Sequence, residues 1–153
     1  MARAWAASRR IDVIQVVLSL LNRETQSLIE ELADEGIGVL ARESLANGFL
    51  SGTVAADTVF PPGSLNARYS GEEVAARVEQ VERLGFLVDG AIQSLPQAAM
   101  RWVLDQRGVS CVLTGARTAD EVSDCAAAAL APPYTPEVLA RAHELHKQDF
   151  AAA

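Results

Sequence analysis

Short apolar runs alternate along the chain with longer segments in which apolar residues recur at helical spacing. Residues 11–18 (IDVIQVVL) and 37–41 (IGVLA) are apolar on both faces, which is typical of parallel strands covered on both sides. A third short strand is predicted over residues 110–113 (SCVL). Because buried strands that alternate with helices form parallel β/α units, the pattern predicts an α/β fold.

Capping side chains mark where the predicted helices begin. Asn22 precedes a helix that should end at Gly36. Thr135 precedes a final helix that should extend to about residue 150. Three more helices should begin where Ser or Thr is followed three residues later by Glu or Gln, the capping-box pattern, at Ser70, Ser94 and Thr118.

Two segments have neither helical nor strand spacing and are predicted to be loops. Residues 43–52 (ESLANGFLSG) directly follow the second strand, and their two glycines let the backbone approach a ligand closely. Residues 53–69 contain Pro61-Pro62-Gly63 and show no periodicity. A loop of this length inside a compact domain is usually functional or mobile.

The number of predicted strands is small for a parallel fold. The 153 residues fit a single domain, residues 1–153, with a core of its own. However, a closed parallel barrel takes eight strands, and an open sheet of three leaves two apolar edges unprotected. We therefore expect a partial (half) barrel of about three parallel strands with flanking helices. We expect it to be completed by homo-oligomerisation or by a partner.

Composition and charge restrict the class of partner. Hydrophobic residues make up 50% of the chain and charged residues 22%, an ordinary balance for a globular protein. The net charge of −7 argues against nucleic acid and anionic membranes, because both select basic surfaces. With no predicted membrane span or secretory signal, we expect a cytoplasmic protein in which Cys111 and Cys125 are buried, reduced thiols.

Metal and nucleophile chemistry find little support. His143 and His146 lie three residues apart in the last predicted helix, a spacing that can present two ligands on one face. They have no third ligand, so a solvated helix end is favoured over a metal site. No serine–histidine or cysteine–histidine arrangement can be argued from the sequence, and we expect no metal.

Three segments in register resemble the second half of an aldo-keto reductase. They are VIQVVLSLLNRE (13–24), GIGVLARESLANGFLSG (36–52) and MRWVLDQRGVSCVLTGARTADEV (100–122). The resemblance implies strands six to eight of a (β/α)₈ barrel that reduces carbonyl compounds with NADPH. It also implies that the family's catalytic aspartate, tyrosine, lysine and histidine belong to the first half of the barrel, which these segments do not include.

The resemblance assigns cofactor contacts to the first two of these segments. Gln15 matches the glutamine that hydrogen-bonds the nicotinamide amide, and Leu45 and Gly48 belong to the turn that wraps the pyrophosphate. Arg42 stands where the family has an aromatic residue that stacks on the nicotinamide, and Glu43 stands in place of a serine. A carboxylate facing a pyrophosphate repels it, by about 1 kcal/mol, so Glu43 counts against tight binding.

The third segment resembles the family's adenosine-binding region. Free backbone N–H groups and an arginine suit a phosphate, and the turn matching the one that receives the 2′-phosphate consists of Gly115, Ala116 and Arg117. Farther along the helix, the family's usual residues are replaced by Glu121 and Cys125, whereas Asp124 stands where the family has Glu. NADP(H) is therefore a possible cofactor that should bind weakly.

Three functions remain open from the sequence. The chain can be the NADP(H)-site half of a carbonyl oxidoreductase, active only when a complementary barrel half is supplied. It can be a redox-inactive half-barrel that binds a small apolar substrate for a rearrangement, cyclisation or dehydration, or a non-catalytic homo-oligomeric remnant. The cofactor-facing positions that are retained together favour the first function, and they are Gln15, Leu45, Gly48 and Arg117. The replaced positions favour the other two functions, and they are Arg42, Glu43, Glu121 and Cys125.

Overall fold

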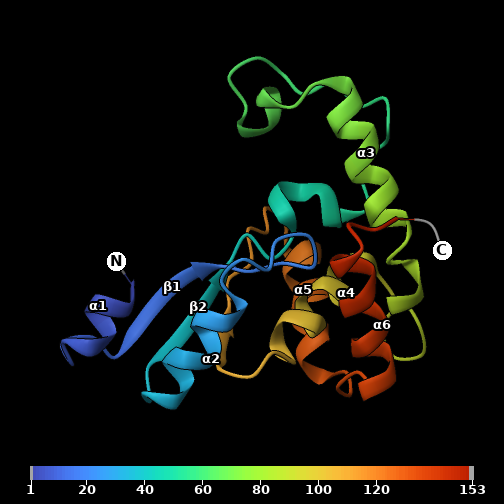
Figure 1. Ribbon diagram of the computed structural model, residues 1–153. Coiled ribbons are helices and arrows are strands. Elements are labelled where there is room, and N and C mark those ends of the chain that lie inside the picture. The colour runs from blue at the N-terminus through green and yellow to red at the C-terminus, as the bar shows by residue number, and fades with distance from the viewer. Residues whose placement is uncertain (1, 152–153) are drawn as a thin grey trace.

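The chain forms an α/β structure around a small parallel sheet (Figure 1). A computed structural model describes residues 2–151. Its strands β1 (Val13–Val17), β2 (Gly38–Arg42) and β3 (Val109–Val112) are parallel and lie in the order β1-β2-β3. The three strands and their flanking helices confirm the predicted fold class, a partial barrel of parallel β/α units.

Helices flank the sheet and extend beyond it. Within residues 2–151 the α-helices are α1 (Ala2–Ala7), α2 (Gln26–Asp34), α3 (Gly71–Glu82), α4 (Leu95–Leu104), α5 (Ala119–Leu130) and α6 (Pro136–Lys147). Short 3₁₀ helices are η1 (Ala46–Ser51), η2 (Leu65–Arg68) and η3 (Gly85–Leu87). In Figure 1, α4, α5 and α6 lie together, whereas α3 and the segment before it project away from the sheet.

The two faces of the sheet differ in how far they are covered. On one face Val16, Val39 and Ala41 are at most 7% exposed. On the other face Val13 is 50% exposed, and Gln15 and Cys111 are also exposed. The expectation of strands covered on both sides is thus wrong for residues 2–151, as is the expectation that Cys111 is buried. Apolar residues on both faces are typical of a barrel strand, but here only the outer face is packed.

A buried arginine links the turn after β1 to the last helix, α6. The Arg23 guanidinium carbon lies 4.3 Å from the centroid of the buried Trp102 ring. The guanidinium donates to the carbonyls of Leu20 at 3.2 Å and Ala142 at 3.0 Å, 119 residues away. Burial lowers its pKa to about 10. Arg23 thereby joins the turn after β1, α4 and α6 into one packed unit.

Most predicted caps are present. Ser70 accepts from the Glu73 N–H while Glu73 accepts from the Ser70 N–H, a complete capping box. Ser94, Thr118 and Thr135 each cap their helix as predicted. The prediction for Asn22 is wrong: α2 begins only at Gln26, and the Asn22 side chain accepts instead from the Glu24 N–H in a turn. A short polar side chain forms such turns as readily as it caps helices.

An ion pair inside the helical layer holds the connection between α5 and α6. Arg101 donates to Asp105 at 2.7 Å, and the two side chains are 11% and 5% exposed. The second oxygen of Asp105 accepts from the Tyr134 N–H at 2.9 Å. Burial raises the pKa of the Tyr134 hydroxyl, which donates to the Leu87 carbonyl at 2.7 Å. One carboxylate therefore satisfies two buried donors.

We expect Asp105→Asn to lower the free energy of unfolding of the chain by about 3 kcal/mol, because it leaves the Arg101 charge buried and unpaired. Urea unfolding followed by circular dichroism measures this change. Asp34→Asn is the matched control: Asp34 pairs with Arg107 where both side chains are more than 60% exposed, and its loss should cost less than about 1 kcal/mol. Equal effects of the two substitutions would contradict the assigned role.

Candidate functional site

The carboxyl ends of the three strands meet at one edge of the sheet. Parallel pairing requires this, because Val17 lies beside Arg42, and Ala41 lies beside Val112. The segments that leave this edge are residues 18–22, 43–52 and 113–118. In parallel α/β folds, ligands bind at this edge. The edge of the sheet therefore locates the candidate site.

The loop after β2 has an unusual backbone. Glu43, Ala46 and Asn47 have φ values of 56°, 49° and 56°, in the left-handed region that residues other than glycine seldom adopt. Gly48 follows at φ 96°. The Asn66 side chain holds the loop by donating to the Asn47 carbonyl at 2.8 Å. Strained backbone held in place by its surroundings is a feature of ligand-binding loops.

Glu43, the residue expected to repel a pyrophosphate, has its charge countered within the chain. Its carboxylate forms an ion pair with the neighbouring Arg42 and also accepts from the Asn47 side-chain amide at 3.3 Å. The two carboxylate oxygens of Glu43 thus accept from different donors, one from Arg42 and the other from Asn47. Arg42, which replaces the family's aromatic residue, therefore weakens the repulsion that Glu43 was expected to exert on a pyrophosphate.

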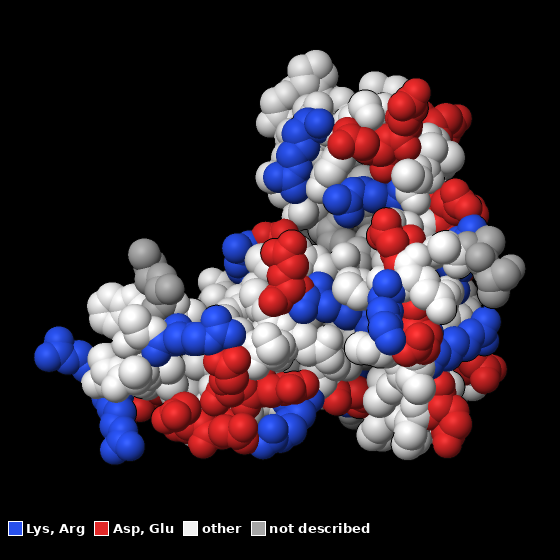
Figure 2. All heavy atoms as spheres, in the orientation of Figure 1, with Lys and Arg blue, Asp and Glu red and all other residues white. Residues whose placement is uncertain are grey.

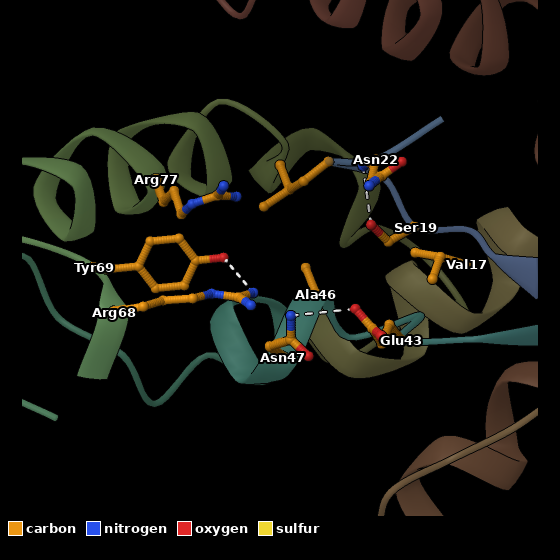
Figure 3. Close-up of a pocket in the computed structure, with 10 residues that line it drawn as sticks. Val17, Ser19, Asn22, Glu43, Ala46, Asn47, Arg68, Tyr69 and Arg77 are labelled. Atoms are coloured by element: carbon orange, nitrogen blue, oxygen red, sulfur yellow. Dashed lines mark hydrogen bonds between the residues drawn. The ribbon is translucent and has the colours of Figure 1, made fainter. Parts of the chain in front are cut away.

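A small cavity lies at this edge, between the sheet and α3. Its volume is about 100 Å³. In Figure 3 the Arg68 and Arg77 side chains and the Tyr69 hydroxyl point into the space from one side, and Ser19 and Asn22 lie across from them. The lining residues come from β1 and the turn after it, the loop after β2, η2 and α3, and they are Val17, Ser19, Leu21, Asn22, Glu43, Ala46, Asn47, Arg68, Tyr69 and Arg77.

Arg68, Tyr69 and Arg77 were not recognised as site residues from the sequence. Arg68 and Tyr69 belong to the segment predicted only as a long loop, and Arg77 lies on the helix that begins after Ser70, to which no site was assigned. The one usable signal was the length of that loop, because long loops in compact domains are often functional. Only the folded chain brings these residues to the edge of the sheet.

The residues expected to contact a nicotinamide and pyrophosphate lie at or near the same edge. Gln15 is exposed on the open face of β1, in register with Leu40 of β2, and makes no side-chain hydrogen bond within residues 2–151. Leu45 and Gly48 lie in the strained loop, where the Gly48 N–H donates to the Leu45 carbonyl at 2.9 Å. Their cofactor contacts stay predictions, and none of the three lines the cavity.

In the turn predicted to receive a 2′-phosphate, the Glu121 carboxylate already binds Arg117. Glu121 accepts from the Arg117 backbone N–H at 2.6 Å, and its second oxygen lies 3.7 Å from the Arg117 guanidinium. A side chain of the protein thus holds the position and charge that an anion would take at this helix N-terminus. Gly115 and Ala116 precede it in a segment without regular structure.

Asp124 faces a neighbouring helix rather than the open edge. One of its oxygens accepts from the Ser94 hydroxyl at 2.7 Å and the other from the Gln97 amide at 2.6 Å. These bonds join α5 to the first turn of α4. Both carboxylate oxygens therefore already have donors, and the Asp124 contact to a cofactor stays a prediction without support from the geometry.

The described chain offers little else for metal or membrane chemistry. Residues 2–151 contain no group of three or more His, Cys, Asp and Glu side chains placed to hold a metal ion. Burial and the nearby Arg23 lower the pKa of His146, the partly buried member of the histidine pair. Within the same residues, none of the helices has the length and apolar character needed to cross a bilayer.

Comparison with known proteins establishes the family. The Aldo/keto reductase family model matches residues 2–147. The chain is 29% identical over 130 residues to the NADH-specific methylglyoxal reductase of Escherichia coli (strain K12), a match that covers 82% of this chain and 39% of that protein. This chain belongs to the aldo/keto reductase family, as its motifs predicted.

Solved structures agree with this assignment. The glycerol dehydrogenase of Gluconobacter oxydans is similar with a TM-score of 0.79 at 25% identity, over 92% of this chain and 44% of that one. An aldo-keto reductase of Bacillus halodurans in its holo form shares the fold with a TM-score of 0.67 at 23% identity, over 94% of this chain and 45% of that one. The chain thus spans about two fifths of the length of the relatives it matches.

Two buried serines near the site should affect the stability of the chain in opposite directions when each is replaced by alanine. The Ser44 hydroxyl is buried in the strained loop and has no hydrogen-bond partner within residues 2–151, whereas the equally buried Ser19 hydroxyl accepts from the Asn22 N–H at 3.0 Å. We expect Ser44→Ala to raise the free energy of unfolding by about 1 kcal/mol and Ser19→Ala to lower it by a similar amount. Denaturant titration measures both, and a loss of stability in Ser44→Ala would show that its hydroxyl is satisfied.

Proposed function

We propose that this chain provides the dinucleotide-binding half of a carbonyl oxidoreductase of the aldo/keto reductase family. The observation that supports the proposal is a cavity at the carboxyl edge of one parallel sheet, lined in part by the loop that also contains Leu45 and Gly48. Gln15 lies two residues before the end of β1, the strand that reaches the same edge. The family fold binds ligands at this edge. The substrate class we propose is a small carbonyl compound, in keeping with the methylglyoxal named for the E. coli relative.

The chain's own residues fit the nicotinamide end of such a cofactor. The Gln15 amide is exposed on the open face of β1 and has both donor and acceptor capacity to bind a carboxamide. The backbone of Gly48 borders open space, since an added Cβ there would meet nothing within 4 Å. A bound nicotinamide supplies a hydride for a carbonyl carbon. The role of these residues is to bind and orient it.

The adenosine end favours NADH over NADPH. Glu121 accepts from the Arg117 N–H at 2.6 Å. Its negative charge therefore lies at the helix N-terminus, the position that a 2′-phosphate would have to occupy. A second anion at this position would be repelled, whereas a ribose hydroxyl would not. The name of the E. coli relative, an NADH-specific enzyme, supports the same choice. We therefore propose NADH as the cofactor, in place of the NADPH that the resemblance implied.

Cofactor choice can be tested at Glu121. We expect the protein to bind NADH at least tenfold more tightly than NADPH, and Glu121→Gln to reduce this ratio several-fold by removing the repelling charge. Cofactor fluorescence on titration, with the complementary barrel half present where the chain alone does not bind, gives both dissociation constants. Glu73→Gln removes the same charge from the same capping position of α3 and should leave the ratio unchanged. A ratio insensitive to Glu121→Gln would exclude this role.

The open face of the sheet requires cover for the proposed function. Val13 and Leu113 are 50% and 37% exposed on the face that would line a barrel. This chain matches 44% of the Gluconobacter structure, so more than half of that protein has no counterpart here. We propose that a complementary half-barrel, on a longer chain or a separate one, packs on this face and brings the proton-donating residues. A second copy of this chain is the alternative occupant.

Assembly gives a direct measurement. We expect the purified chain to sediment or scatter as a dimer or larger species, because exposed apolar strands associate in water. In the assembled protein the Cys111 thiol, exposed in the single chain, should react with a maleimide at least tenfold more slowly than in a Cys111-containing peptide. A monomer with a freely reactive Cys111 that nevertheless reduces carbonyls with NADH would contradict the need for cover.

A further inference from the structure

Two arginines flank one tyrosine at the carboxyl edge of the sheet. The guanidinium carbons of Arg68 and Arg77 lie 4.9 Å and 4.7 Å from the centroid of the Tyr69 ring. The Arg68 guanidinium also donates to the Tyr69 hydroxyl at 3.0 Å. Phe49 supports the group from beneath, with its ring 5.5 Å from that of Tyr69. Cation–π contacts of this kind hold long side chains in one orientation.

Neither of these arginines has an acidic partner. Within residues 2–151, no carboxylate oxygen lies within 4.0 Å of the Arg68 or Arg77 guanidinium, although Arg83, farther along α3, pairs with Glu79 at 2.7 Å. Glu73, one turn before Arg77, bonds to the Ser70 N–H at 2.8 Å instead. The two guanidinium groups therefore reach the cavity without a direct ion pair, which suits the binding of an external anion.

The shape of the cavity suits a single compact anion. Figure 3 shows both guanidinium groups and the Tyr69 hydroxyl directed into the space that Asn22 lines from the other side. The volume of about 100 Å³ is well above the ~10–15 Å³ that one water molecule needs, so the cavity can take a compact polyatomic anion.

The basic side chains at the cavity are few and local. Figure 2 shows basic and acidic side chains mixed over α3 and the segment before it, whereas mostly acidic side chains gather over α2. Among the residues lining the cavity, Arg68 and Arg77 contribute two positive charges and Glu43 one negative charge, which Arg42 compensates. Planar guanidinium groups bind phosphate oxygens in pairs, so two of them suit a phosphate better than a carboxylate.

We propose that Arg68, Arg77 and Tyr69 form a phosphate clamp, which receives one phosphate of the bound dinucleotide's diphosphate. The assignment to the dinucleotide rests on the proposed function, whereas the phosphate clamp rests on the cavity alone. The clamp offsets the loss of the family's serine at Glu43. It also gives the long segment before α3 a function, since that segment carries Arg68 and Tyr69 to the edge of the sheet.

Isothermal titration of the protein with inorganic diphosphate and, separately, with NADH tests the clamp. We expect Arg68→Gln and Arg77→Gln each to weaken diphosphate binding at least tenfold, because each removes a charge-assisted pair of hydrogen bonds. Arg83→Gln removes the same charge at the C-terminal cap of α3, outside the cavity, and should leave binding within twofold. Circular dichroism checks folding, and Arg68, which is exposed, provides the variant that keeps its fold if Arg77→Gln does not.

The outcomes separate the clamp from the cofactor. If both variants weaken diphosphate and NADH in parallel, and diphosphate displaces NADH, the clamp and its assignment to the dinucleotide both hold. If diphosphate binding depends on Arg68 and Arg77 but NADH binding is absent or unchanged, the clamp holds for a phosphorylated substrate and the dinucleotide assignment fails. If diphosphate does not bind at millimolar concentration, or binds all variants equally, the clamp is refuted.

Discussion

Parallel hydrogen bonding between three strands is the constraint on which the candidate site depends. Because β1, β2 and β3 run in one direction, each must return along a helix, and every loop that leaves a carboxyl end emerges at the same edge. The functional groups therefore converge although they lie far apart in sequence. On one face of the same sheet Val13 and Gln15 are exposed. The candidate site thus lies at the carboxyl edge of a sheet that is packed on its other face.

Charge is distributed so that most acids and bases cancel locally and a few do not. Asp105 is satisfied by Arg101 inside the helical layer, and Glu43 by Arg42 at the rim. Glu121 occupies the helix N-terminus itself, so this end of the site is already negative. At the cavity, by contrast, Arg68 and Arg77 form no direct ion pair within residues 2–151. The electrostatic pattern thus distinguishes the two ends of the proposed dinucleotide site more sharply than the fold does.

The sequence predicted the elements whose signals are local. The Ser70 capping box and the end of α2 before Gly36 depend on neighbouring residues, and both are present. It failed where the outcome depends on distant partners. Asn22 had two local options, a helix cap and a turn, and the chain takes the turn. Arg77 was assigned no role, because nothing nearby in sequence shows that Tyr69 and the cavity at the edge of the sheet lie against it.

The buried Arg23 has a consequence for how the parts of the chain depend on one another. Its guanidinium keeps its proton at neutral pH, with a pKa of about 10, and is satisfied by carbonyls and the Trp102 ring rather than by an acid. Displacing α6 would remove the Ala142 carbonyl and leave the Arg23 guanidinium with one acceptor fewer, next to the turn that leads from β1 to the cavity. Order in the last helix and order in the floor of the site are therefore coupled, and should be lost together on partial unfolding.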